Sequence, residues 1–354
     1  MLARRLLAIA PISTSKGQSS SRARLLAKTG LPPLGLPVCS RKDQSSSKHS
    51  RIRILEPSPT HIEQNLRRHV DRLAGLIGPR HLKKPKTIAA TLGMLRGEWE
   101  AMGYSVAAET YDALGDEATN LMVETPGKNS LNSKSSREII LLGAHYDTIA
   151  PTPGADDNAS AVAVLLEVSR LLRDHLGKRT ARYVAFACEE MPYFHTFSMG
   201  SQTNATRARE RGDRIKAMLC LEMVGYFRDE PGSQAIPDAI PNYLRPLFPQ
   251  RGNFLAAVGN LRSAKLLWPL RRGFKRATRL PLFTIALPEK IRDIRRSDNS
   301  SFWDQGYPAL MLTDTSYLRN PHYHLETDTP ETLDYQRMTQ VTIGVAGAMR
   351  RFLR

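Results

Sequence analysis

The sequence predicts an α/β fold built around a buried, mostly parallel sheet. Short apolar runs typical of strands alternate along the chain with stretches whose apolar residues recur every three or four positions, as in amphipathic helices. The strand-like runs are almost continuously hydrophobic, which is typical of parallel strands covered on both faces. The chain has 354 residues, 41% of them hydrophobic, which is enough for one large core.

The periodic segments give the elements in order. Helices are expected at residues 62–78, 88–103, 159–176 and 334–353. Strands are expected at residues 104–113, 120–127, 136–145, 181–190, 216–226, 253–260 and 307–315. We expect the first two strands to form an antiparallel pair at the start of the sheet.

Residues 1–55 differ in composition from the rest of the chain. They hold eleven Lys or Arg residues and one acid, Asp43, and so carry +10 of the net charge of +17. This Ser- and Arg-rich composition resembles an organelle transit peptide or a disordered basic tail. Their apolar run, Leu6–Ile12, is short and broken by Pro11, which argues against a secretory signal. We expect a leader at residues 1–55 and a folded domain at 56–354, without a transmembrane segment, in the cytoplasm or an organelle matrix rather than secreted.

Two further features narrow the class of protein. The basic run at residues 271–279 predicts a solvated helix end, because a nucleic-acid surface would interleave stacking aromatics and only Phe274 is present. We therefore expect no nucleic-acid partner. The three cysteines, Cys39, Cys188 and Cys220, lie far apart, which argues against a disulfide framework or a cysteine zinc site.

Histidines and carboxylates gather where the predicted strands end. His145 ends one strand, Glu189 and Glu190 end the next, and Glu222 ends a third, whose apolar run covers residues 217–221. Ligands of α/β proteins bind outside the carboxyl ends of the strands, so these side chains are expected at one edge of the sheet. The same edge would receive Asp147, Asp156, Asp157, His322 and His324. The spacing does not decide between Asp156 and Asp157, or between His322 and His324.

These residue types together favour a metal site. Zinc takes imidazole nitrogen and carboxylate oxygen, and two adjacent zinc ions need a bridging carboxylate. Glu222 stands in an apolar segment, where an unpaired carboxylate is costly and calls for a cation. Asp147 is placed to accept the second imidazole hydrogen of His145. Of Glu189 and Glu190, one can bind metal while the other stays free as a base.

The motifs around these residues resemble a known family. "GAHYDT", "PGADDNAS", "CEE", "LEMVGY", "SDNSSFW" and "PHYHLETDT" follow one another within residues 60–350. In this order the chain is similar to the co-catalytic di-zinc aminopeptidases, which include the bacterial leucyl aminopeptidases and are related to glutamate carboxypeptidase and glutaminyl cyclase. The resemblance implies a three-layer α/β/α sandwich with a mixed, mostly parallel central sheet, and a pocket rim supplied by residues 226–300.

The resemblance also implies a role for each site residue. His145, Asp157 and Glu222 would hold one zinc ion. Asp157, Glu190 and His324 would hold the second ion, so that Asp157 bridges the two. The remaining roles are those of Glu189 as general base and Asp147 as the partner of His145. Tyr323 matches a position that helps hold the substrate carbonyl in the carboxypeptidase branch of the family.

Two positions depart from the family pattern. Glu222 stands where many relatives have Asp, which changes the reach of that ligand. Asn299 stands where a histidine is frequent, which affects the expected pocket.

The implied activity is that of a zinc-dependent exopeptidase with two zinc ions per chain. The motifs favour an aminopeptidase that hydrolyses the N-terminal bond of a peptide substrate with zinc-activated water. A carboxypeptidase is also compatible with the motifs, since it needs a cation for the substrate carboxylate and Arg295, Arg296 and Arg319 lie near them. Two further alternatives are a glutaminyl cyclase-like transferase, which would be expected to depart from the "DDNAS" context that is intact here, and a non-catalytic binding protein on the same fold, which would be expected to lack ligands that are all present. The sequence predicts neither the side-chain preference nor the oligomeric state.

Overall fold

The computed structural model describes residues 58–128 and 138–354, which form one mixed sheet of eight strands. The order across the sheet is β1-β2-β4-β3-β5-β8-β6-β7. The strands are β1 (Ala107–Ala113), β2 (Asp116–Thr125), β3 (Glu138–His145), β4 (Thr180–Phe186), β5 (Arg214–Glu222), β6 (Leu255–Asn260), β7 (Leu282–Leu287) and β8 (Ala309–Thr313). The expected leader at residues 1–55 lies outside the described residues, and we retain a domain boundary near residue 56 as a proposal.

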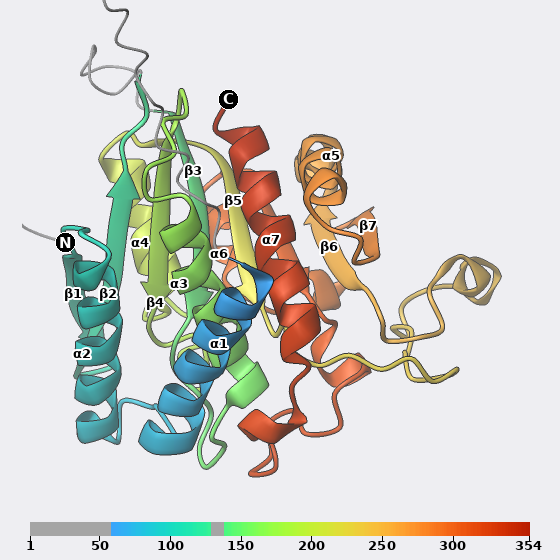
Figure 1. Cartoon of the computed structure of the whole chain (residues 1–354), viewed down its shortest axis with the longest axis horizontal. Helices are drawn as coiled ribbons and strands as arrows, with labels where there is room; N and C mark the ends of the chain where they lie inside the picture. The colour runs from blue at the N-terminus through green and yellow to red at the C-terminus, as the bar shows by residue number, and fades with distance from the viewer. Residues whose placement is uncertain (1–57, 129–137) are drawn as a thin grey trace, which may run out of the picture. The chain divides into compact units, whose positions relative to one another are not determined.

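Helices cover both faces of this sheet. The α-helices are α1 (Pro59–Val70), α2 (Pro85–Ala101), α3 (Ala161–Leu171), α4 (Gly200–Glu210), α5 (Leu267–Ala277), α6 (Asn299–Asp304) and α7 (Tyr335–Phe352). Two π-helical segments, η1 (Asp71–Ile77) and η3 (Ala155–Ser160), continue α1 and precede α3. Helices α1, α3 and α7 lie in front of the sheet and α4 lies behind it (Figure 1). The three-layer α/β/α prediction is confirmed.

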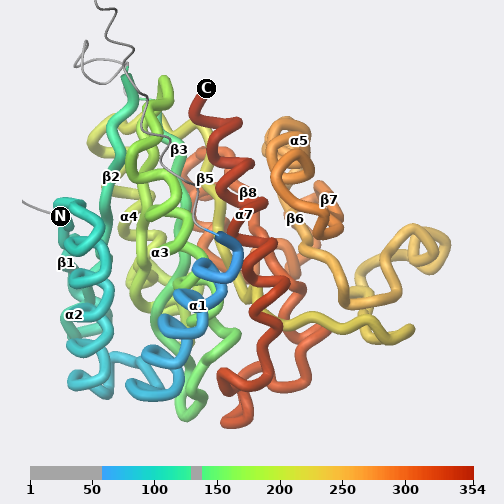
Figure 2. Tube along the Cα trace, viewed as in Figure 1, coloured from blue at the N-terminus to red at the C-terminus, as the bar shows by residue number. Residues whose placement is uncertain are grey.

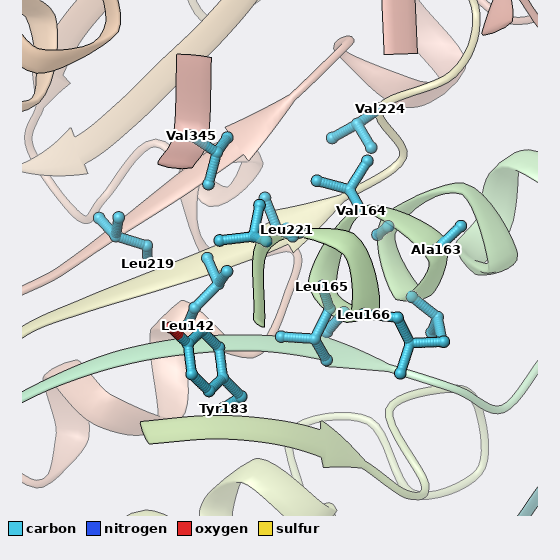
Figure 3. Close-up of a cluster of buried hydrophobic side chains, with 14 of the residues drawn as sticks. Leu142, Ala163, Val164, Leu165, Leu166, Tyr183, Leu219, Leu221, Val224 and Val345 are labelled. Carbon is cyan, nitrogen blue, oxygen red and sulfur yellow. The ribbon is translucent and has the colours of Figure 1, made fainter. Parts of the chain in front are cut away.

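Alternate residues of the central strands feed two separate cores. Ile140 and Leu142 of β3 belong to the larger core, which contains the buried faces of α1, α3 and α7. Leu142 lies close to the side chains of α3 in that core (Figure 3). Ile139 and Leu141 point the other way, into the smaller core under α4 and α6. Both faces of these strands are buried, because successive side chains enter opposite cores. This explains why the strands are continuously hydrophobic.

The direction of the strands was predicted only in part. β3, β4, β5 and β8 are parallel, and β1 and β2 form the expected antiparallel pair. β2 is also antiparallel to its other neighbour, β4. A third antiparallel pairing, between β8 and β6, was not expected. Hydrophobic periodicity carries no information on strand direction, and residues 223–254, which connect β5 and β6, run out beyond the sheet before returning (Figure 2). β7 was missed, although its apolar run lies between Pro281 and Pro288.

Membrane-spanning helices and disulfides can be examined in the described part of the chain. None of its helices combines the length and hydrophobicity that a membrane-spanning segment requires. Cys188 and Cys220 are buried and free, and neither forms a disulfide. The structure thus gives no cysteine cross-link between the two described cysteines.

Candidate metal centre

The carboxyl ends of three neighbouring strands meet at one edge of the sheet. β4, β3 and β5 are adjacent and parallel, so their last residues lie side by side. His145 is the last residue of β3, Glu222 is the last residue of β5, and Glu189 and Glu190 follow β4. All four side chains are buried.

The chain leaves β4 at Phe186, earlier than the sequence predicts. The N–H of Ala187 donates to the side chain of Asn120, and its carbonyl accepts the N–H of Gly200 at 2.8 Å, so this residue is bonded outside the sheet ladder. Cys188 then adopts a left-handed conformation with φ of 56°. This bend turns the two glutamates that follow out of the regular alternation of a strand.

Asp147 holds the bend in place and contacts His145. Its two carboxylate oxygens accept the backbone N–H groups of Glu189 and Glu190, each at 3.1 Å. The Nδ1 atom of His145 lies 3.2 Å from the backbone oxygen of Asp147 and 3.5 Å from its carboxylate. The sequence predicted the carboxylate as the imidazole partner. The backbone oxygen lies nearer, because the carboxylate is taken up by the two glutamate N–H groups.

Asp157 lies in a short irregular loop that other side chains hold. Within η3 its φ of −105° and ψ of 86° are not helical. The backbone N–H groups of Asp156 and Asp157 donate to the two carboxylate oxygens of Asp328, at 2.9 and 3.0 Å. The side-chain oxygen of Asn158 accepts the N–H of Met223 at 2.9 Å, which ties the loop to the end of β5. The position of Asp157 is therefore fixed by contacts on both sides of it.

Asp156 and His322, which the spacing could not separate from their neighbours, are engaged elsewhere. The carboxylate of Asp156 accepts the N–H of Gly225 at 2.9 Å and the amide of Asn320 at 2.7 Å. Nδ1 of His322 lies 2.9 Å from the hydroxyl of Thr327. Neither side chain belongs to the groups of potential ligands described next.

Five side chains form two groups of potential metal ligands that share one carboxylate. Nε2 of His145 lies 3.4 Å from Oδ1 of Asp157 and 3.3 Å from Oε2 of Glu222. Nε2 of His324 lies 3.2 Å from Oδ2 of Asp157 and 3.4 Å from Oε2 of Glu190. Asp157 therefore presents one oxygen to each group, and in each group the ligand atoms lie within 4.8 Å of one another.

Unpaired buried atoms test whether these residues fit a metal. Among the described residues, no hydrogen-bond partner is found for Nε2 of His145, Oδ1 of Asp157 or Oε1 of Glu190. Buried polar atoms in proteins are almost always bonded, and leaving them unpaired is costly. A cation among these atoms would satisfy all three. Nitrogen and carboxylate oxygen donors in groups of three suit zinc.

The electrostatics of the cluster also favour a cation. Burial works to lower the pKa of His145, but the surrounding carboxylates, Glu189 foremost, outweigh it and raise that pKa well above its usual value. His324 is also partly buried, yet its hydrogen bonds with Asp157 and Glu190 raise its pKa to about 10. Burial, together with the charge of Asp157, raises the pKa of Glu190 to about 7. The cluster thus holds more negative charge than its two imidazoles can balance.

Tyr323 and the three arginines that could bind a substrate carboxylate differ in their contacts. The ring of Tyr323 stacks on His324 with centroids 3.7 Å apart, and its hydroxyl lies 3.5 Å from Nη2 of Arg296. Arg295 is paired with two carboxylates. Arg319 is buried and donates to backbone carbonyls and a glutamine side chain. Of the three, only Arg296 faces the surroundings of the cluster.

An apolar pocket adjoins the cluster. Its walls come from β6, β7 and residues 234–249, which lie within the region expected to supply the rim, and also from β8, which lies outside that region. Glu222, a member of one ligand group, lines this pocket, and so does Tyr323, which stacks on His324 of the other group. Its apolar lining includes Ile240, Phe254, Phe283, Ile285 and Met311.

Several supporting residues were missed at the sequence level. The hydroxyl of Ser297 donates to Oε2 of Glu222 at 2.6 Å, and Asp328 anchors the loop of Asp157. Both stand inside the quoted motifs, but a polar residue in a motif does not reveal its partner. Asn299, at the position where a histidine is frequent, donates to the carbonyl of Ile294 and does not line the pocket.

Comparison with known sequences identifies the family. The sequence profile of peptidase family M28 matches residues 120–349, and the chain belongs to this family of peptide-bond hydrolases. It is 32% identical over 303 residues to the uncharacterized protein YfbL of Escherichia coli (strain K12), which covers 83% of this chain and 90% of that protein. It is 27% identical over 219 residues to leucine aminopeptidase 1 of Arthroderma otae, 58% of this chain but only 52% of that protein.

Solved structures show the same fold. BSAP, a zinc aminopeptidase from Bacillus subtilis, superposes with a TM-score of 0.64 at 14% identity, over 82% of this chain and 95% of that one. A glutaminyl cyclase from an Acidobacteriales bacterium superposes with a TM-score of 0.60 at 19% identity, over 89% of this chain and 99% of that one. Aminopeptidases and glutaminyl cyclases thus share this architecture, so the activity of the chain must be argued from its site.

Replacement of Asp328 tests the anchoring of the Asp157 loop. Asp328→Asn keeps one oxygen acceptor and loses the second, so one N–H of the loop is left without its partner. We expect the free energy of unfolding to fall by about 1–3 kcal/mol in urea denaturation of the metal-free protein. Asp174→Asn, on an exposed side chain, is the matched control and should change little. Equal stability of the two variants would show that Asp328 does not anchor the loop.

Proposed function

We propose that the chain is a zinc-dependent aminopeptidase that binds two zinc ions and removes the N-terminal residue of peptides. The observation that carries this proposal is the carboxylate of Asp157, with one oxygen toward His145 and the other toward His324. The unpaired buried atoms of both groups support it. The ligands would be His145, Asp157 and Glu222 for one ion, and Asp157, Glu190 and His324 for the other.

Glu189 is the residue that we assign to proton transfer. When bound, zinc would supply Lewis-acid activation of water and of the scissile carbonyl. Glu189 belongs to neither ligand group, and its carboxylate lies 4.0 Å from Nε2 of His145. From there it can take a proton from the attacking water and return it to the leaving amine. The hydroxyl of Tyr323, which lies 3.5 Å from Nη2 of Arg296, would help hold the substrate carbonyl oxygen.

The charges around the cluster support recognition of a free amine. Glu189 and Glu222 present carboxylates that attract an ammonium group, whereas Arg295 and Arg319 are engaged in contacts of their own. The apolar pocket beside Glu222 would then receive the side chain of the N-terminal residue. We therefore propose a preference for large apolar N-terminal residues, because an unpaired charge in such a pocket is costly.

Two glutamine substitutions separate the base from the ligand. Glu189→Gln should keep the metal content while turnover falls about a hundred- to ten-thousand-fold, the range for loss of a general base. Glu190→Gln should lower the metal content, because a neutral amide replaces a carboxylate ligand. Glu326→Gln, an exposed change in the loop of His324, is the matched control for both. The measurements are metal analysis and kcat, and exchanged outcomes would exchange the two roles.

Matched peptides test which end of the substrate is recognised. Leucyl peptides would be compared with both ends free, with an acetylated N-terminus and with an amidated C-terminus. Acetylation is expected to abolish cleavage, since it removes the ammonium group that Glu189 and Glu222 would attract, and amidation should be tolerated.

Different outcomes of the peptide test would favour a different activity. Loss of cleavage on amidation alone would favour a carboxypeptidase, with Arg296 as the cation for the terminal carboxylate. Cyclisation of N-terminal glutamine, without cleavage of any peptide, would favour a glutaminyl cyclase-like transferase. Either result would overturn the aminopeptidase proposal.

A further inference from the structure

Helix α5 presents a basic face to solvent. Leu270, Gly273 and Phe274 are buried on the side that packs against α7, which lies next to α5 in Figure 1. The exposed residues of α5 recur at three- and four-residue spacing, so they share the opposite side of the helix. We define the α5 face by its exposed residues Trp268, Arg271, Arg272, Lys275 and Arg276. The basic run at residues 271–279 covers the last turns of α5, and its cations are exposed, as expected for a solvated helix end.

The positive charge of the α5 face is not balanced by acidic residues nearby in the sequence. Residues 239–288 contain nine Lys or Arg residues and no Asp or Glu. Within the described part of the chain, Arg271, Lys275 and Arg276 form no ion pair with a carboxylate. Arginines elsewhere on the surface, such as Arg211 and Arg214, are paired with acids. The α5 face is thus a concentrated, uncompensated cationic surface.

An exposed tryptophan lies among these cations. Trp268 is 60% exposed, whereas Trp99 and Trp303 are buried. The guanidinium groups of Arg272 and Arg351 lie 5.1 and 5.8 Å from the centre of its ring. Tryptophan is enriched at the interface between membrane and water, where its ring lies at the level of the headgroups.

The α5 face lies away from the candidate metal centre. A surface hollow next to it is lined by Lys265 and Arg351 together with Ile140 and Lys216, which stand near the amino ends of β3 and β5. The metal centre lies at the carboxyl ends of the same strands. Attraction of substrate into the active site therefore does not account for this charge.

We propose that the α5 face docks on a membrane surface rich in anionic phospholipid. The cations of the face would neutralise headgroup phosphates, and Trp268 would enter the interfacial layer. A nucleic-acid surface fits less well, because Phe274 is fully buried and the ring of Trp268 already has arginine partners. The docking proposal is independent of the peptidase proposal.

The emission of Trp268 tests docking directly in the full chain. Residues 1–55 are basic as well but contain no tryptophan, so a change in emission reports on the face and not on the leader. Vesicles of phosphatidylcholine mixed with phosphatidylglycerol are expected to shift the emission to shorter wavelength, and vesicles of phosphatidylcholine alone are not. Trp268→Phe should abolish the shift, because the other two tryptophans are already buried.

Charge reversal assigns the binding to the face. Arg271→Glu with Lys275→Glu should weaken vesicle binding by more than about twenty-fold, since each cation contributes roughly five-fold. Lys84→Glu with Lys86→Glu, an equal change of net charge on exposed residues of another segment, should leave the emission shift in place. The proposal would be overturned by vesicle binding without an emission shift, by equal loss in both double variants, by no binding, or by tighter binding to duplex DNA than to anionic vesicles.

Discussion

The candidate metal centre depends on the position of one carboxylate, that of Asp157. Its two oxygens lie 3.4 Å from His145 and 3.2 Å from His324, which come from distant parts of the chain. Burial disfavours the charge of this carboxylate, and the two imidazoles beside it stabilise that charge and lower its pKa. Hydrogen bonds of the loop that carries Asp157 fix its position between them.

Other buried acids act as clamps for the backbone. Asp328 accepts the N–H groups of the Asp157 loop, and Asp147 accepts those of Glu189 and Glu190. Each of these two acids holds an irregular segment next to a strand end. Hydrogen bonds between strands cannot orient the side chains there, because the segment lies outside the sheet. Ser297, by contrast, acts on a ligand candidate directly through its hydrogen bond with Glu222. The sheet brings the strand ends together, and the clamps set which side chains face the cluster.

Sequence patterns predicted the parts of this arrangement that follow from periodicity. His145 and Glu222 could be placed because each ends an apolar strand, and the sheet then brings them together. Periodicity could not separate Asp156 from Asp157, since that choice depends on bonds to Gly225 and Asn320, far away in sequence. The direction of β6 could not be predicted for a similar reason, because pairing with β8 is a tertiary contact. Asp328 was missed because nothing local shows that its partners are backbone N–H groups.

Titration of zinc into the metal-free protein tests the bridging carboxylate most directly. The wild type is expected to bind two ions per chain by calorimetry. Asp157→Asn leaves a single side-chain oxygen and should bind fewer than two, with the remaining site weakened, because both groups share this residue. Asp156→Asn, the same change one position earlier, should still bind two. Retention of two zinc ions at unchanged affinity by Asp157→Asn would contradict the shared-carboxylate account.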